Sequence, residues 1–214
     1  MRAGWLSGVS QKVARIIGLR LTLNGRVPES GLIIANHVGY LDVVALSTVS
    51  RCLFVSKAEV AEYPIFGEVG RWAGIVFIDR RYRSNVAEVA AEMRELLTAG
   101  VPLALFPEGT TSSGDTVLPF KPSLFASVIE SGCPVTPCAI KYSLPGGLVS
   151  EEICYWGQHV IGPHLFHLLG KTDIGAALTF GEPVTPTSDR KELARDLRAQ
   201  LIDLRSGERS AQPA

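Results

Sequence analysis

Short apolar runs separated by segments of helical character recur along this chain. The runs span 31–35, 52–55, 74–80, 101–106, 135–140 and 176–180, and turn-forming or polar residues bound them. Runs of this length are typical of buried strands. Strands that alternate with helices favour a parallel sheet, because parallel neighbours need a crossover connection. The sequence therefore predicts an α/β fold, with a single domain and an open, mostly parallel central sheet flanked by helices.

The first 18 residues predict an amphipathic helix. Its apolar side contains Trp5, Leu6, Val9, Val13, Ile16 and Ile17. Five basic residues precede the first acidic one, Glu29. A basic, apolar helix suits an anionic membrane surface, but the pattern is equally typical of a helix that packs over a core. The predicted organisation is a helix and possible membrane anchor over 1–18, a main domain over 19–205 and a disordered tail over 206–214.

Local signals predict where several elements turn or begin. Asn24-Gly25 is typical of a two-residue hairpin, and Pro64 is expected to interrupt a partly helical segment. Capping boxes that begin at Asn85 and Asp189 predict the first turns of two further helices.

Composition suggests a protein with an apolar surface. The 214 residues are 46% hydrophobic and 20% charged, with a mean hydropathy of +0.21. No apolar run reaches the roughly 18–20 residues that span a bilayer, and the N-terminus lacks a signal-peptide pattern. We therefore expect peripheral association with the cytoplasmic face of the cell membrane.

Charge and ligand spacing disfavour several classes of partner. The net charge is zero, which disfavours nucleic acid. The cysteines show no C-x-x-C pair, which favours reduced thiols. Three histidines lie close together in an apolar run, without an acidic or cysteine partner at a spacing that suits a metal site. They are His159, His164 and His167. Neither a metal nor a cofactor is expected.

Polar clusters follow three of the predicted strands. His37 and Asp42 come after the first, Arg80 ends another, and Glu108 to Ser113 follow a third. The carboxyl ends of parallel strands meet at one edge of a sheet, where ligands bind in open α/β folds. This shared edge is predicted to be an active site.

His37 and Asp42 suit acid–base chemistry if they meet. Their spacing of five positions separates them by about 140° in a regular helix, so a loop or irregular turn must bend His37 back. The carboxylate would then fix the imidazole tautomer and leave the other nitrogen free as a general base. The alternative is an ordinary helix start, with Asn36 as cap and Asp42 solvated.

Four motifs, in order, resemble the blocks of the glycerolipid acyltransferase family, which includes 1-acylglycerol-3-phosphate acyltransferase. They are Asn36-His37-x-x-x-x-Asp42, Gly74-x-x-Phe77-x-x-Arg80, Phe106-Pro107-Glu108-Gly109-Thr110-Thr111-Ser112 and Val135-Thr136-Pro137. The similarity covers about residues 23–185. It implies a glycerol-3-phosphate acyltransferase-like fold and acyl transfer from acyl-CoA or acyl-carrier protein to a lysophospholipid, first of all 1-acylglycerol-3-phosphate.

The resemblance also implies residue roles. His37 is the expected base and Asp42 its orienting partner. The acceptor phosphate is expected at Arg80 and the 108–112 loop, where Gly109, Thr110, Thr111 and Ser112 offer N–H groups and hydroxyls. Glu108 would repel a phosphate, so it is expected to orient Arg80, the loop or an acceptor hydroxyl. The expected supporting residues are Asn36, Gly74, Phe77, Phe106, Pro107, Lys121 and Pro137.

Some features depart from the family pattern. Ser123 stands where the family usually has glycine after Lys121-Pro122, which leaves the role of Lys121 open. Three alternatives also remain: transfer to another lysolipid such as a lyso-amino-acid lipid, a lysophospholipase or thioesterase in which His37 activates water, and a non-catalytic lipid-binding module.

Overall fold

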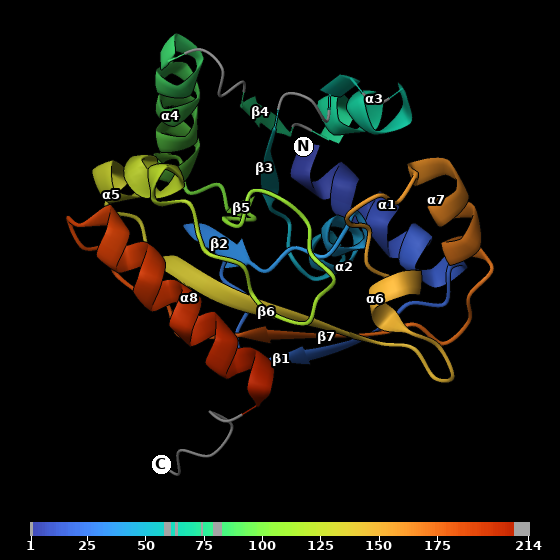
Figure 1. Cartoon of the computed structure of the whole chain (residues 1–214). Coiled ribbons are helices and arrows are strands. Elements are labelled where there is room, and N and C mark those ends of the chain that lie inside the picture. Colours follow the sequence, from blue (N-terminus) through green and yellow to red (C-terminus); the bar gives the residue numbers. More distant parts are fainter. Residues whose placement is uncertain (1, 58–60, 63, 74, 79–82, 208–214) are drawn as a thin grey trace.

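The computed structural model describes residues 2–57, 61–62, 64–73, 75–78 and 83–207. Over these residues one sheet of seven strands runs through the molecule (Figure 1). Its order is β1 (Arg20–Asn24), β7 (Gly175–Phe180), β6 (Val135–Ser143), β2 (Leu32–Ala35), β5 (Leu103–Leu105), β3 (Leu53–Lys57) and β4 (Val76–Ile78). All neighbouring pairs are parallel except β6 and β7. The predicted α/β fold with a mostly parallel sheet is confirmed.

Helices cover both faces of the sheet (Figure 1). Along β2, Ile33 and Ala35 belong to one buried cluster, and Leu32 and Ile34 belong to the other. The first cluster includes side chains from α1 (Arg2–Ile16), α2 (Leu41–Val49) and α7 (Ile161–Leu169). The second includes side chains from α4 (Arg83–Thr98), the 3₁₀ turn η2 (Pro122–Phe125), α5 (Ala126–Ser131) and α8 (Arg190–Ser206). A central strand buried on both faces explains why β2 is apolar throughout.

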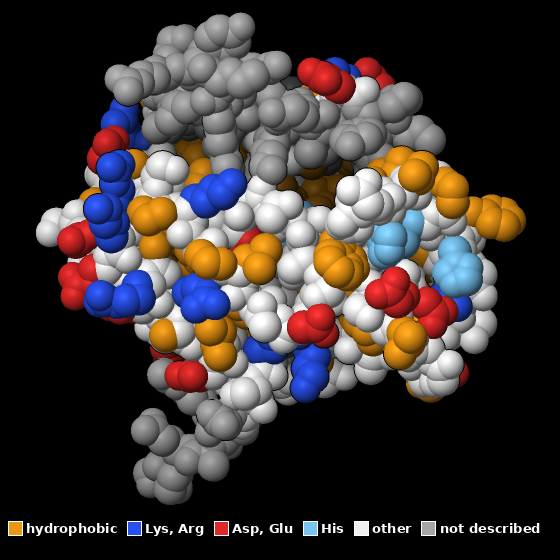
Figure 2. Space-filling model, viewed as in Figure 1, with side chains coloured by type: hydrophobic (Ala, Val, Ile, Leu, Met, Phe, Trp, Pro, Cys, Tyr) orange, Lys and Arg blue, Asp and Glu red, His pale blue; other side chains and the backbone are white. Residues whose placement is uncertain are grey.

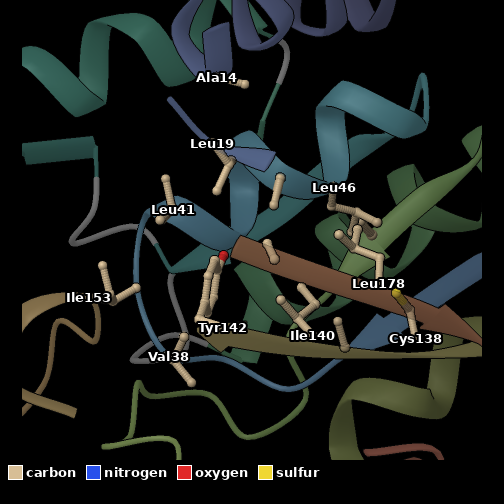
Figure 3. Packing of buried hydrophobic residues seen from close by; sticks show 14 of the residues in the cluster. Ala14, Leu19, Val38, Leu41, Leu46, Cys138, Ile140, Tyr142, Ile153 and Leu178 are labelled. Atoms are coloured by element: carbon tan, nitrogen blue, oxygen red, sulfur yellow. The ribbon is translucent and has the colours of Figure 1, made fainter. Parts of the chain in front are cut away.

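The strand β6 extends beyond its neighbour β2. Ala35, the last residue of β2, pairs with Cys138, whereas β6 continues to Ser143 against β7. Cys138, Ile140 and Tyr142 alternate along β6 and join the cluster beneath α2 (Figure 3). The far end of β6 therefore lies beside the loop that follows β2.

The predicted hairpin at Asn24-Gly25 is wrong. β1 has β7 as its partner, and the two strands are parallel. Gly25 has a φ of +78°, and a Cβ there would collide with the carbonyl oxygen of Phe180. Glycine is thus explained by close packing of two backbones rather than by a hairpin turn.

Two helix boundaries also differ from expectation. Pro64 begins α3 (Pro64–Ala73) instead of interrupting a helix, because proline at the first helical position loses no intrahelical hydrogen bond. α4 begins at Arg83, so Asn85 lies inside it rather than before it. The cap at Asp189 is confirmed, since its Oδ1 accepts from the N–H groups of Lys191 and Glu192 at 2.7 and 3.3 Å.

The N-terminal helix α1 packs against α2. Leu6, Ala14 and Ile17 are only 4–5% exposed, whereas Trp5 is 43% and Ile16 is 80% exposed. The predicted apolar side is therefore divided between the core and the surface. Within the described part of the chain, no helix combines the length and apolar character needed to cross a bilayer. The last seven residues of the predicted tail, 208–214, lie outside the described residues.

Candidate active site

The loop after β2 brings His37 back onto Asp42, in the first turn of α2. His37 Nδ1 lies 2.8 Å from Asp42 Oδ2. The N–H groups of Val38 and Gly39 donate to the same oxygen at 2.7 and 3.0 Å. These bonds hold an irregular turn and overcome the roughly 140° that a regular helix would put between the two side chains.

The contact with Asp42 assigns the tautomer of neutral His37. A carboxylate oxygen only accepts, so Nδ1 carries the proton and the lone pair is on Nε2. The Asp42 side chain is fully buried, while that of His37 is 20% exposed. Among the described residues none forms a hydrogen bond with Nε2. This nitrogen is therefore free to act as a general base.

Phe106 fixes the plane of the imidazole. The two rings stack with centroids 4.0 Å apart and an interplanar angle of 11°. Phe106 in turn stacks on the buried Phe54 at 6.0 Å. His37 is thus held at its edge by a carboxylate and on its face by an aromatic ring.

Glu108 is buried and binds backbone groups. Its Oε1 accepts from the N–H of His37 at 2.8 Å, and its Oε2 accepts from the N–H of Leu118 at 2.9 Å. Burial raises the pKa of Glu108, and the two backbone N–H groups oppose that rise. The carboxyl therefore links the loop that contains His37 to the segment after β5, which agrees with the expectation that Glu108 orients the loop.

The 109–112 loop lies against the same backbone. Ser112 N–H donates to the carbonyl oxygen of His37 at 3.0 Å. Gly109 has a φ of +70°, and a Cβ there would lie 2.8 Å from Lys121 Nζ. Glycine thus permits both the turn and the approach of the lysine, which brings a cation to the loop.

Asn36 ties the start of the loop to β6. Its side-chain amide donates to the carbonyl oxygen of Ile140 at 2.9 Å and accepts from the Ile140 N–H at 2.8 Å. The side chain therefore continues the backbone ladder beyond Ala35. The alternative role as a helix cap does not occur, since α2 has Tyr40 at its N-cap position.

The other predicted residues differ in their distance from this cluster. The Pro107 carbonyl accepts from Lys121 N–H at 2.9 Å, while Thr110 is exposed and Thr111 half-buried. Pro137 lies within β6 opposite Ile34, and Phe77 lies in the edge strand β4. Arg80 and Gly74 lie outside the described residues.

Two contacts were not anticipated from the sequence. Tyr142 O–H donates to Asp42 Oδ1 at 2.9 Å, although the predicted strand ended at Ile140. Tyr40 O–H lies 2.8 Å from His164 Nδ1, which gives one of the clustered histidines a packing partner. The alternation of Cys138, Ile140 and Tyr142 could have extended the strand, but no local pattern predicts a partner 100 positions away.

A family profile described as "Acyltransferase" matches residues 20–141 of this chain. A relative from Brucella abortus, named lyso-ornithine lipid O-acyltransferase, is 36% identical to this chain. The match spans 88% of this chain and 77% of the relative. The protein of that name from Rhodobacter capsulatus is 35% identical, and the match spans 92% of this chain and 75% of that relative. A 1-acyl-sn-glycerol-3-phosphate acyltransferase from Neisseria gonorrhoeae is 40% identical over 54% of this chain and 45% of its own.

A solved structure has the same fold. The crystal structure of the 1-acyl-sn-glycerophosphate acyltransferase PlsC from Thermotoga maritima matches with a TM-score of 0.71. The match covers 99% of this chain and 81% of that chain at 21% identity.

Proposed function

The chain belongs to the glycerolipid acyltransferase family and is an O-acyltransferase, and from that premise we propose that it acylates the free hydroxyl of a lysolipid with His37 as general base. The observation that carries this proposal is the buried His37–Asp42 pair. The 2.8 Å contact at Nδ1 leaves Nε2 as the basic atom of a partly exposed imidazole.

The proposed reaction needs one base and no covalent enzyme intermediate. Nε2 of His37 takes the proton of the acceptor hydroxyl as its oxygen attacks the thioester carbonyl. The tetrahedral intermediate then expels the thiolate, which takes the proton from the imidazolium. The products are a new ester and a free thiol. Asp42 stabilises the imidazolium between these two steps.

The donor is proposed to be acyl-CoA or acyl-carrier protein, since both present an activated thioester. For the acceptor, relatives named lyso-ornithine lipid O-acyltransferase cover 88–97% of the chain, against 54% for the gonococcal 1-acyl-sn-glycerol-3-phosphate acyltransferase. We therefore place lyso-ornithine lipid first. 1-Acylglycerol-3-phosphate was the first expectation from the sequence and is the second candidate here. It stays a candidate because the gonococcal 1-acyl-sn-glycerol-3-phosphate acyltransferase is 40% identical over the part that matches.

The acceptor headgroup is proposed to bind at the 109–112 loop. This loop lies next to His37 through the Ser112 N–H bond, and Lys121 approaches it at Gly109. Backbone N–H groups and a lysine suit an anionic group, either a phosphate or a carboxylate. Arg80 is proposed as a further cation for a phosphate.

A two-donor assay tests the function. We expect the purified protein, given acyl-CoA or acyl-carrier protein and a panel of lysolipids, to produce an esterified lysolipid, detected by mass spectrometry. Lyso-ornithine lipid should be used with a higher kcat/KM than 1-acylglycerol-3-phosphate. Release of free fatty acid alone would indicate a lysophospholipase or thioesterase, and binding without product would indicate a lipid-binding module.

Arg80→Lys separates the two acceptors in the same assay. A lysine cannot reproduce the planar fork of arginine, so only the phosphate-bearing acceptor should lose kcat/KM, by roughly tenfold to over a hundredfold. Equal losses on both acceptors would contradict a phosphate site at Arg80.

We also propose peripheral membrane association, with α7 as the main contact. The segment from Trp156 to Leu169 exposes large apolar side chains (Figure 2). Their exposed fractions are 37% for Trp156, 67% for Val160, 82% for Phe166 and 55% for Leu169. Such side chains enter the boundary of a bilayer favourably. The N-terminal helix is a second candidate through Trp5 and Ile16, but its other apolar residues pack on α2. Deleting 1–18 would therefore expose part of the core.

Phe166→Ser should weaken binding to lipid vesicles by about tenfold, because it removes the most exposed aromatic side chain of this surface. Sedimentation with vesicles measures the bound fraction, and Leu23→Ser serves as the matched control because Leu23, 47% exposed, lies on the edge strand β1. Unchanged binding of Phe166→Ser, with weaker binding of Trp5→Ser, would move the contact to α1.

A further inference from the structure

Tyr142 is a buried phenol beside the His37–Asp42 pair. Its side chain rises from β6 towards α2, with its hydroxyl oxygen at the end nearest that helix (Figure 3). The hydroxyl donates to Asp42 Oδ1 at 2.9 Å, and the whole residue is 8% exposed. Neither the sequence motifs nor the proposed reaction gives this residue a role.

The four described donors to Asp42 divide unequally between its oxygens. Oδ2 accepts from His37 Nδ1, Val38 N–H and Gly39 N–H. In the described part of the chain, Tyr142 is the single donor to Oδ1. Burial, and after it the charge of Asp42, raises the pKa of Tyr142 well above its usual value. The phenol therefore stays protonated and acts as a donor.

The position of Tyr142 is fixed by the sheet and not only by the hydroxyl. Two residues before it, the backbone of Ile140 makes both hydrogen bonds with the Asn36 side chain. On the other side, Tyr142 pairs with Ala176 of β7. The phenol thus belongs to a rigid strand, whereas the donors to Oδ2 belong to the irregular loop that precedes α2. A donor on a rigid strand can set the rotation of the carboxylate that it bonds.

We propose that Tyr142 is a positioning residue of the acyl transfer, which holds the Asp42 carboxylate so that its other oxygen faces His37 Nδ1. This proposal rests on the proposed function of His37 as base. The phenol also takes up part of the negative charge of Asp42, and it therefore moderates how strongly the pair holds a proton.

Removing the phenol hydroxyl has a definite direction of effect. With neutral imidazole the pair has a net charge of −1, and with imidazolium its net charge is zero. A hydrogen-bond donor stabilises the negative state more, so it favours release of the proton. Without this donor the pair should take up a proton more readily. The titration midpoint of His37 should move to higher pH, by about one pH unit.

Other titratable groups face Asp42 and must be considered in such a titration. They are His37 in its own loop, Tyr142 and Cys138 from β6, Cys154 after α6 (Val149–Glu152) and Glu108 after β5. Burial raises the pKa of Cys154 to about 12 and that of Cys138 well above its usual value, so both stay neutral thiols. Burial also raises the pKa of Glu108. Glu108 is unchanged in a Tyr142 variant, so it contributes equally to both profiles.

Tyr142→Phe tests the proposal because it removes one oxygen and keeps the ring. We expect kcat to fall about tenfold with a smaller change in the acceptor KM. The acid limb of the kcat/KM profile should move to higher pH by about one unit. Tyr155→Phe is the matched control, since the backbone N–H of Tyr155 bonds the same loop at Val38, whereas the hydroxyl that bonds Asp42 Oδ1 is that of Tyr142. Its acid limb should stay in place.

An NMR titration of the histidine side chains keeps this proposal separate from the catalytic one. The His37 signal is assigned by its absence in His37→Gln. A midpoint that rises in Tyr142→Phe, and not in Tyr155→Phe, supports the positioning role even if His37 proves not to be the base. An unmoved His37 midpoint would overturn the proposal, and a lower melting temperature alone would then show that Tyr142 only supports the fold.

Discussion

His37→Ala should lower turnover by about 10²–10⁴-fold while the protein remains folded. The loss is large because no other described group is positioned to take the hydroxyl proton at this point. The fold should survive because the bonds that hold the loop use the backbone of residue 37. Its N–H donates to Glu108 and its carbonyl accepts from Ser112, and alanine retains both.

The measurement is a steady-state assay with the acceptor in detergent micelles, together with a thermal melt. His167→Ala is the control, because His167 is exposed on α7 and its imidazole lies 3.4 Å from Glu152. It should keep the wild-type kcat. A folded His37→Ala protein with wild-type turnover would remove His37 from the mechanism.

Asp42→Asn should reduce kcat by roughly tenfold to over a hundredfold, with little disturbance of the loop. The asparagine oxygen can accept from the three groups that now donate to Oδ2. Its amide nitrogen can donate to the Tyr142 hydroxyl, which rotates to accept this bond. The hydrogen bonds are kept and the charge is lost. The neutral amide cannot stabilise an imidazolium as a carboxylate does.

Asp42→Ala gives the contrast. It leaves the N–H groups of Val38 and Gly39 and the Tyr142 hydroxyl without their buried partner. Each buried donor left unsatisfied costs about 1–3 kcal/mol of stability. The summed cost of the three donors approaches the whole free energy of unfolding of a domain. Melting curves should therefore separate the two variants. If Asp42→Asn retained full activity at a normal melting temperature, the charge would not be needed.

The strands and the His37–Asp42 contact could be predicted because their signals are local. The run Leu32–Ala35 is apolar throughout since both of its faces are buried, and strand ends in a parallel sheet bring polar residues to one edge. His37 and Asp42 are close in sequence, so only the bend of one loop had to be inferred. The cap at Asp189 is equally local.

Other features depend on distant partners and could not be predicted. Asn24-Gly25 has the composition of a hairpin, but the partner of β1 is β7, more than 150 positions away by the Asn24–Thr179 contact. Glu108 was expected to orient Arg80, the loop or an acceptor hydroxyl, but its bond to the His37 N–H, 71 positions away, could not be identified among these from the sequence. The predicted strand ended at Ile140 because the continuous apolar run stops at the exposed Lys141, although the buried Tyr142 continues the alternation of β6.

The order of the strands has a consequence for synthesis of the chain. β2 lies between β5 and β6, and both are translated after it. Asn36 meets Ile140 across 104 positions, which corresponds to roughly 5–20 seconds at about 5–20 residues per second. During that interval the nascent chain presents Leu32–Ala35 first without either flanking strand, and then, once β5 (Leu103–Leu105) is made, still without β6. An apolar, unpaired strand is a site for aggregation or for a chaperone. A ribosome that stalls before residue 135 would hold a chain that contains both His37 and Asp42 but lacks β6, whose Ile140 and Tyr142 bond Asn36 and Asp42.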